Sequence, residues 1–413
     1  MDWSIRVYMG GDNDLDGYAM RDLLEMQQAP GVDTLDVLVQ VDRKRQYIPS
    51  TEKWEEGRRF RIRACSDDAT LCAEELGRLG EINTGDPDTL IDFINWSASI
   101  HQGTYSALVL WGHGSGWKPG PDGRANRTGS GRLFNPVATS PALKWLLPDF
   151  APEDAEGRFI AIDDQARDAL EMAELEFALN RSNKVWDLLA FDACSMMQLE
   201  LIHMLAPYAN WICGSQAVEP KDGWPYREIL GDLSASTRWD GLALGITVVT
   251  RFAESYTERE HTVYSLVDTV SLNTLSVALS QLGDALAADI DTVIDSVSGA
   301  RRRCLAFREK GYVDIGDFLN LLADKPAVIA YRGLIDASLD ALKTVIAACR
   351  FSEDSSRPWR GAGNRGLAPA TGLSIYFPIE APNTTEWAVY GRLPFHQQHP
   401  GWLVFLDKFL NSP

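Results

Sequence analysis

Residues 4–267 alternate between short apolar runs and segments of helical periodicity. Apolar runs at 4–9, 35–41, 108–111 and 188–191 are typical of buried strands. The segments between them carry apolar side chains three and four residues apart, as an amphipathic helix does. This alternation predicts an α/β fold with a central, mostly parallel sheet flanked by helices.

Several local patterns refine this prediction. Asp14 or Asp16 is expected to cap a helix through 18–26, and 163–180 is expected to be helical. The segments Trp54 and 60–62 indicate an exposed hairpin near a sheet edge.

The chain divides into two predicted regions. Residues 1–268 form the α/β domain, and 269–413 are mainly helical, with a late strand at 372–378 expected to return to the main sheet. Residues 118–157 interrupt the first region, and eleven of these forty are Gly or Pro. A long insert without regular structure is usually either functional or disordered.

Composition and charge exclude several classes of protein. Hydrophobic residues make up 45% of the chain, which is typical of a globular protein, and no apolar run reaches the length of a membrane span. The formal charge of −19 disfavours nucleic acid and anionic membranes as partners.

Six cysteines in 413 residues do not indicate a disulfide framework. The start MDWSIRVYMGGD has no secretory pattern. A reduced, cytoplasmic protein is therefore expected, unless the sequence is the mature form of an exported precursor.

Two residues stand out as candidate reactive groups. Cys194 follows the strand at 188–191 and is expected to open a helix, whose N-terminal N–H groups and dipole would stabilise a thiolate. His113 follows another strand, in the glycine-rich turn WGHGSGW. Parallel strands present their C-terminal ends on one edge, so the two side chains could form a nucleophile–base pair.

Each residue also has an ordinary structural explanation. A lone histidine is often a turn residue, and a free cysteine is often a small buried hydrophobe. The latter explanation suits Cys65, Cys72, Cys213, Cys304 and Cys349. Ser115 is a poor nucleophile candidate because position 113, where a nucleophile elbow needs glycine, is His.

Six motifs in a fixed order resolve this ambiguity. They are the segments 12–25, 81–87, 111–117, 191–195, 219–226 and 372–378. In this order they resemble the clostripain family of cysteine peptidases, which belongs to the caspase-like clan, and the likeness spans nearly the whole chain. The resemblance implies a caspase-like sandwich fold.

The resemblance also implies residue roles. His113 becomes the catalytic histidine and Cys194 the nucleophile, with an oxyanion hole formed by the N–H groups of Gly114 and Cys194. Asp192 and Asp222 match the acidic floor of the S1 pocket, which implies cleavage after Arg or Lys. Two carboxylates would bind a guanidinium through charge-assisted hydrogen bonds and favour Arg over Lys.

The insert lies where zymogens of this family are processed, between the histidine and the cysteine. An upstream protease or the enzyme itself would then activate the chain. Candidate cut sites are Arg124, Arg127, Arg132, Arg158, Arg167 and Lys184.

No cofactor is required for this chemistry, and no metal ligands are assigned. The segment 12–17 imitates the start of an EF-hand loop, but Leu23 stands where a bidentate Glu is needed. His396 and His399 are expected in a surface loop. Calcium dependence occurs within the family, so a cation elsewhere is left open.

The sequence therefore predicts an endopeptidase that acts on proteins or peptides with accessible Arg or Lys. The alternative from another class is a catalytically silent binding or scaffold protein of the same fold. A peptide ligase acting through the same acyl-enzyme is a third interpretation, which no feature specifically supports.

Overall fold

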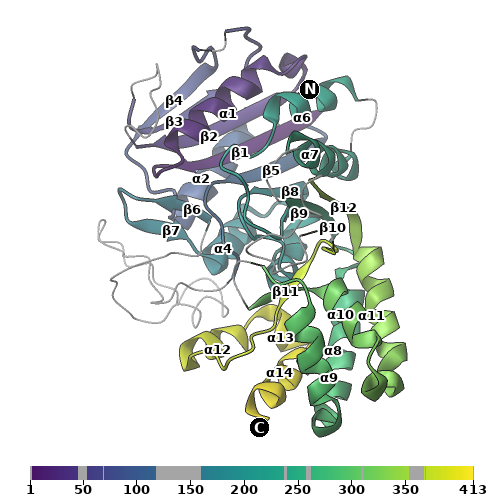
Figure 1. Ribbon diagram of the computed structural model, residues 1–413. Coiled ribbons are helices and arrows are strands. Elements are labelled where there is room, and N and C mark those ends of the chain that lie inside the picture. Colours follow the sequence, from purple (N-terminus) through teal and green to yellow (C-terminus); the bar gives the residue numbers. More distant parts are fainter. Residues whose placement is uncertain are drawn as a thin grey trace.

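The computed structural model describes most of the chain (Figure 1). The described residues are 2–44, 54–67, 69–117, 160–236, 240–256, 262–307, 311–352, 367 and 369–412. The predicted insert at 118–157 lies outside them, so its role as an activation segment stays a prediction.

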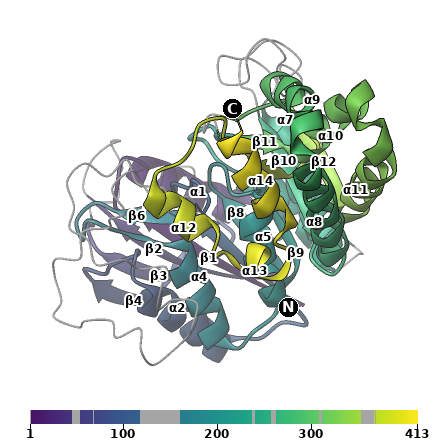
Figure 2. The same cartoon turned by 90° about the horizontal axis from the view of Figure 1, so that it is seen from below.

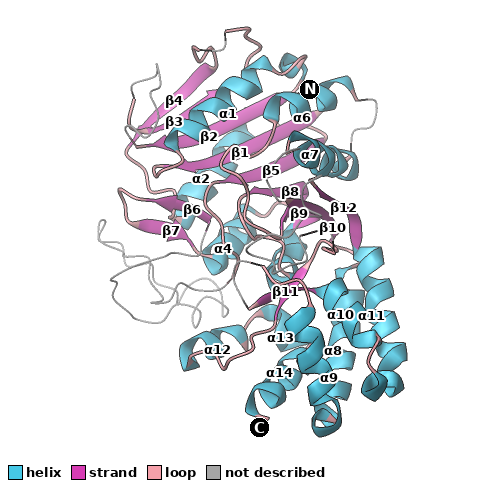
Figure 3. Ribbon diagram, in the orientation of Figure 1, coloured by secondary structure: helices cyan, strands magenta, loops and turns pink. Residues whose placement is uncertain are grey.

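A nine-stranded sheet forms the centre of the α/β region, with strand order β12-β10-β9-β8-β5-β1-β2-β3-β4 (Figure 3). Its middle five strands are parallel: β2 (Asp36–Arg43), β1 (Trp3–Gly11), β5 (Tyr105–Trp111), β8 (Trp186–Asp192) and β9 (Ala209–Ser215). Antiparallel pairs flank them: β3 (Gly57–Arg61) with β4 (Glu74–Gly80), and β10 (Val263–Asp268) with β12 (Ile346–Phe351). The predicted mostly parallel sheet is confirmed. A hairpin does form its edge, but Trp54, Phe60 and Ile62 are buried and not exposed as predicted.

Helices cover both faces of this sheet because its strands are buried on both sides. In β1, Val7 packs into one apolar cluster and Tyr8 into the other. Helices α1 (Asp16–Gln28), α6 (Tyr226–Ala235) and α7 (Gly241–Ser255) contribute to the Val7 side. Helices α2 (Pro87–Ile100), α4 (Met172–Ser182) and α5 (Leu199–Leu205) contribute to the Tyr8 side.

The C-terminal helices lie below the sheet in Figure 1, the first four beyond its β10–β12 end and the next two beneath its centre (Figures 1 and 2). They are α8 (Leu272–Ala288), α9 (Ile290–Arg303), α10 (Ile315–Ala323), α11 (Arg332–Val345), α12 (Thr384–Tyr390), α13 (Pro394–Gln398) and α14 (Gly401–Asn411). Short 3-10 turns are η1 (Val32–Thr34), η3 (Ala206–Tyr208) and η4 (Pro326–Tyr331). The apolar residues of the C-terminal helices join the same cluster as Tyr8, so the two predicted regions share a core.

The strand expected at 372–378 does not return to the main sheet. Its central part is β13 (Ser374–Tyr376), which pairs with β11 (Tyr312–Asp314) in a separate two-stranded sheet. The main sheet instead ends in β12 on this side. Propensity identifies a strand here, but pairing is decided by tertiary contacts.

Two other local predictions are wrong. The first part of 163–180 belongs to a hairpin of β6 (Ile160–Asp163) and β7 (Asp168–Leu170), and only α4 is helical. Leu15 occupies the N-cap of α1, with no side-chain cap, because Asp14 and Asp16 have other partners. Asp86 is the N-cap of α2, since its side chain accepts a hydrogen bond from the Asp88 N–H.

Cys65 and Cys72 form a disulfide in the connection between β3 and β4. The interpretation of these two residues as small buried hydrophobes is therefore wrong. Since the pair closes a loop within one hairpin, sequence spacing alone could not distinguish it from two free thiols.

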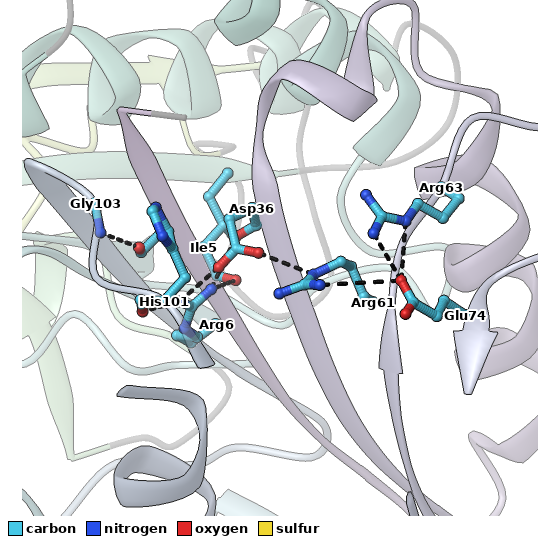
Figure 4. A network of polar contacts seen from close by, with 9 residues as sticks. Ile5, Arg6, Asp36, Arg61, Arg63, Glu74, His101 and Gly103 are labelled. Atoms are coloured by element: carbon cyan, nitrogen blue, oxygen red, sulfur yellow. Dashed lines mark hydrogen bonds and ion pairs between the residues drawn. The ribbon is translucent and has the colours of Figure 1, made fainter. Parts of the chain in front are cut away.

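The N-terminal ends of β1 and β2 carry a network of ion pairs (Figure 4). Asp36 lies 2.8 Å from the Arg6 guanidinium and 3.1 Å from that of Arg61. Arg63 and Glu74 extend the network along the neighbouring strands at 2.7 Å. In the described part of the chain, no helix has the length and apolarity needed to cross a bilayer.

Candidate active site

The site lies at the C-terminal edge of the parallel strands. It is next to the point where the order in which strands are added to the sheet changes direction. From β1 the chain continues to β2 on one side, and from β5 it continues to β8 on the other. Open α/β sheets place their ligand sites in the crevice at such a switch point. Asp12 and Asp14 follow β1, and His113 follows β5.

The register of β5 against β8 brings His113 and Cys194 to the same level. Trp111 is paired with Asp192, and each reactive residue comes two positions later. The Gly112 N–H donates to the Asp192 carbonyl at 3.2 Å, which extends the pairing beyond the strands. The two predicted reactive residues therefore occupy adjacent turns on one sheet edge.

Gly114 packs directly on the turn that holds Cys194. A Cβ at this position would lie 2.8 Å from both the Ala193 Cβ and the Cys194 carbonyl oxygen. Only glycine allows this close approach of the two backbones. The predicted oxyanion donors thus come from two main chains in contact, although their role stays a prediction.

Cys194 does not open a helix, contrary to the sequence prediction. Helix α5 begins only at Leu199, and Ser195 has a backbone φ of 58°. Tertiary hydrogen bonds hold this left-handed turn, since the Ser195 N–H donates to the Ala217 carbonyl at 2.9 Å. The helix dipole therefore cannot explain activation of the thiol.

A different backbone group reaches the sulfur. The Glu219 N–H donates to Cys194 Sγ at 3.2 Å. Hydrogen bonds to the charged form favour it, so this N–H supports a thiolate. The loop 219–226, one of the motifs of the family, is thereby joined to the candidate nucleophile.

His113 has an acidic partner that the sequence did not assign. Its Nε2 lies 2.6 Å from Asp14 Oδ1, and Lys221 Nζ lies 2.5 Å from Asp14 Oδ2. Burial raises the pKa of Asp14, but the hydrogen bonds of Lys221 and His113 outweigh it, so the pKa lies below its ordinary value. Asp14 was expected only as a helix cap, and its distance from position 113 in sequence concealed the contact.

Gln198 connects the two reactive turns and was also missed. Its Oε1 accepts a hydrogen bond from the Trp117 N–H at 3.2 Å, and its Nε2 donates to the Ser195 carbonyl at 2.9 Å. A Cβ at Gly116, whose φ is 83°, would overlap the Gln198 amide. A buried glutamine in an apolar segment was the available signal.

Asp192 is buried against the loop 219–226. It is 4% exposed, and its carboxylate accepts hydrogen bonds from Tyr226 Oη at 3.0 Å and the Trp224 N–H at 3.4 Å. Burial raises the pKa of Asp192 to about 7, although these donors lower it. Burial and the charge of Asp192 raise the pKa of Glu219 well above its ordinary value.

Asp222 has a different environment from Asp192. Its side chain is 56% exposed and forms an ion pair with Arg21 of α1. The joint role of the two aspartates in an S1 pocket therefore stays a prediction.

Two of the candidate processing sites lie in described residues. Arg167 is exposed in the turn between β6 and β7. Lys184 is partly buried, with Nζ 4.0 Å from the centre of the Trp186 ring, and burial lowers its pKa to about 8. Arg124, Arg127, Arg132 and Arg158 lie outside the described residues.

The EF-hand-like segment does not form a calcium-binding loop of its own. Within the EF-hand-like segment, Asp14 contacts His113 and Asp16 pairs with Arg43 at 2.6 Å. His396 is not in a surface loop, because it is 2% exposed within α13. Burial lowers its pKa to about 3.

Comparison with known proteins gives one consistent family. The sequence model of the clostripain family matches residues 7–129 and 145–388. Clostripain from Hathewaya histolytica is 26% identical over 260 residues, which are 59% of this chain and 44% of clostripain. The match thus covers less than half the length of that relative.

Solved structures share the fold. A secreted C11 cysteine protease from Bacteroides thetaiotaomicron, in complex with an irreversible peptide inhibitor, superposes with a TM-score of 0.65 at 17% identity, over 96% of this chain and 98% of that one. An inactive zymogen C11 protease from Parabacteroides distasonis gives 0.63 at 18% identity, with the same coverage. The predicted fold class is confirmed.

Proposed function

The chain belongs to the clostripain family of cysteine peptidases, and from that premise we propose that it is an endopeptidase that cleaves after arginine and, less readily, after lysine. The observation that carries this proposal is the β5–β8 register, which sets His113 and Cys194 in adjacent turns. The same sheet edge carries the buried acid Asp192.

In the proposed reaction, Cys194 Sγ attacks the carbonyl carbon of the scissile bond. The oxyanion is stabilised by the N–H groups of Gly114 and Cys194. His113 transfers a proton to the leaving amine, which leaves an acyl-enzyme, and water then hydrolyses the thioester and regenerates the thiol.

Asp14 acts as a positioning residue in this scheme. Its carboxylate holds Nε2 of His113 at 2.6 Å, so the other ring nitrogen, Nδ1, is the one that exchanges protons. A carboxylate in this position fixes the tautomer and stabilises the imidazolium.

Asp192 and Glu219 provide the preference for a basic side chain. Both carboxyls are buried, and burial raises the pKa of each above its ordinary value. In the proposed S1 pocket, the guanidinium of a substrate arginine would pair with these two carboxyls. Its positive charge would favour their ionised form. A neutral side chain would form no ion pair with these carboxyls and would lack this contribution to binding.

The chain is made as a zymogen in this proposal and is cleaved between His113 and Cys194. Arg167 is the candidate site that the described residues favour, because it lies exposed in a tight turn. The Cys65–Cys72 disulfide favours an oxidising compartment over the cytoplasm that the sequence led us to expect.

Fluorogenic peptides that differ only in the residue before the cut test the specificity. Arginine, lysine and the neutral isostere citrulline should be cleaved in that order of decreasing kcat/KM, with citrulline near background. Equal turnover of arginine and citrulline peptides would contradict an acidic S1 pocket.

The matched variants Cys194→Ala and Cys349→Ala test the nucleophile. Cys194→Ala should lose turnover, while Cys349→Ala, which lies in β12 away from the site, should retain it. N-terminal sequencing of the incubated wild type should show new ends after basic residues. Undiminished cleavage by Cys194→Ala would reject the proposal.

A further inference from the structure

A second group of acidic residues lies beside the candidate active site, on the other side of β1. Asp12 follows β1, Asp42 lies in β2 and Asp163 ends β6. One carboxylate oxygen from each lies within 4.8 Å of the other two. In the described residues, no other group of three His, Cys, Asp or Glu side chains converges in this way.

All three side chains belong to fully buried residues, each 0% exposed. Asp163 is satisfied, since its two oxygens accept the Ala166 N–H at 2.8 Å and the Thr84 N–H at 2.9 Å. Asp42 Oδ1 accepts the Arg43 N–H at 3.0 Å. Asp42 Oδ2 and both oxygens of Asp12 receive no hydrogen bond from the described residues.

Three such oxygens in a buried site are expensive unless a positive group completes them. The nearby basic side chains have other partners: the Arg43 guanidinium binds Asp16 at 2.6 and 2.9 Å, and Lys44 pairs with Asp164 at 3.2 Å. Glu81 and Asp164 add further negative charge. Burial, followed by the charge of Asp163, raises the pKa of Asp12 to about 7 and of Asp42 to about 9.

We propose that Asp12, Asp42 and Asp163 bind one hard divalent cation, Ca²⁺ or Mg²⁺. Carboxylate oxygens from several chain segments are the ligands that these ions prefer. Three oxygens that converge on a single point suit a metal ion, whereas a planar guanidinium requires acceptors arranged along its edge. The neighbouring backbone carbonyls and water can supply the remaining ligands.

The position of this site gives the cation a structural consequence. It would join the β1–α1 loop to β2 and to the β6–β7 hairpin. That loop already contacts the hairpin, because the Asp164 N–H donates to the Asp12 carbonyl at 2.8 Å and Asn13 Nδ2 donates to the Ile162 carbonyl at 2.7 Å. Asp14, which holds His113, is two residues from Asp12.

Binding is tested independently of proteolysis in the full-length Cys194→Ala protein after treatment with a chelator. Calorimetric titration with CaCl₂ and, separately, with MgCl₂ should show one ion per chain for the preferred metal, and that ion should raise the melting temperature. The two titrations distinguish Ca²⁺ from Mg²⁺.

In the same background, Asp12→Asn and Asp42→Asn should each weaken cation binding by roughly 100-fold or more. Substitution of residues that only support the ligands of a metal site already lowers metal affinity about 10–100-fold. Asp88→Asn removes the same charge from an exposed position of α2 and should bind as the parent does. Circular dichroism confirms folding, and either ligand variant alone suffices to decide.

The inference is overturned if neither ion binds, or if a folded ligand variant binds as tightly as Asp88→Asn. Because the readouts are heat and melting temperature, the result does not depend on whether the chain cleaves peptides.

Discussion

Buried carboxylates at the two ends of strands β1 and β2 differ in whether the chain supplies a basic partner. At the N-terminal end, Asp36 lies between the guanidinium groups of Arg6 and Arg61, at 2.8 and 3.1 Å (Figure 4). At the C-terminal end of the same strand, Asp42 faces Asp12 and Asp163. At the N-terminal end, arginine side chains of the chain itself neutralise the carboxylate. At the C-terminal end, three acidic side chains converge.

The contrast separates structural acids from functional ones. Asp36, at the N-terminal end, is matched by two basic side chains of the chain itself. The acids at the C-terminal edge, including Asp192 and Glu219 beneath the loop 219–226, are buried with raised pKa values. Perturbed groups of this kind cluster at functional sites, so we expect cations from outside the chain to complete them.

The largest effect on stability is expected from breaking the ion pair of Arg6 and Asp36. Arg6→Ala should lower the free energy of unfolding by about 3–5 kcal/mol, because it leaves Asp36 charged and buried. The Arg6 and Asp36 side chains are each only 1% exposed. Denaturant unfolding measures the change.

Arg61→Ala is the matched control for Arg6. Arg61 contacts the same carboxylate, but its side chain is 20% exposed, so its loss should cost about 1–2 kcal/mol. Equal losses in the two variants would mean that burial does not set the strength of this network.

The next effect concerns the acid expected to receive a substrate cation. Asp192→Asn should reduce kcat/KM for arginine peptides by about 30-fold or more, because a desolvated charge pair typically contributes about 2–5 kcal/mol. Asp222→Asn, at the exposed partner of Arg21, should reduce it only about two- to fivefold. A larger loss in Asp222→Asn would reverse our assignment of the main S1 acid.

Without a bound cation, the cluster of Asp12, Asp42 and Asp163 should make the free energy of unfolding depend on pH. The folded protein holds protons on Asp12 and Asp42 up to about pH 7 and 9, whereas the unfolded chain releases them near the ordinary value of 3.8. In chelator, the free energy of unfolding should therefore fall as pH rises from about 4 to 9.

Saturating cation should flatten this slope, because the ion binds the deprotonated carboxylates. Asp42→Asn in chelator should also show a shallower slope than the parent protein. A slope unchanged by both treatments would show that other groups cause it. Unfolding curves at a series of pH values provide the test.

The smallest effect is expected from the exposed pair of Arg21 and Asp222, whose side chains are 52% and 56% exposed. Arg21→Ala should change the free energy of unfolding by less than about 1 kcal/mol. It should lower KM for arginine peptides about two- to threefold, since Asp222 becomes available to substrate.

Arg251→Ala is the control for this variant. It breaks a similarly exposed pair with Asp232 and should leave KM unchanged. A KM that falls equally in both variants, or in neither, would exclude a role for Asp222 in substrate binding.

Most of the fold could be predicted because it follows local patterns. The parallel strands are continuous apolar runs, and β5 and β8 end in the glycine-rich and acidic turns that carry His113 and Cys194. The errors arose where tertiary contacts override local preference. The turn at Ser195 delays α5 because its N–H bonds Ala217, and β13 pairs with β11 through contacts that no local pattern encodes.

The supporting residues of the site could not be predicted for a related reason. Asp14 meets His113, and Gln198 meets Trp117, across long stretches of chain. Asp12, Asp42 and Asp163 come from three separate elements. Tertiary packing brings such residues together, since Asp163, for example, comes from the separate β6–β7 sheet.

The most direct test of the account is the site of covalent labelling by a peptidyl-arginine acyloxymethyl ketone, located by tandem mass spectrometry. We predict a single adduct on Cys194, lost in Cys194→Ala and strongly slowed in His113→Ala. An adduct on Cys213, Cys304 or Cys349, or arginine-peptide hydrolysis that continues with Cys194 unlabelled, would contradict the central claim.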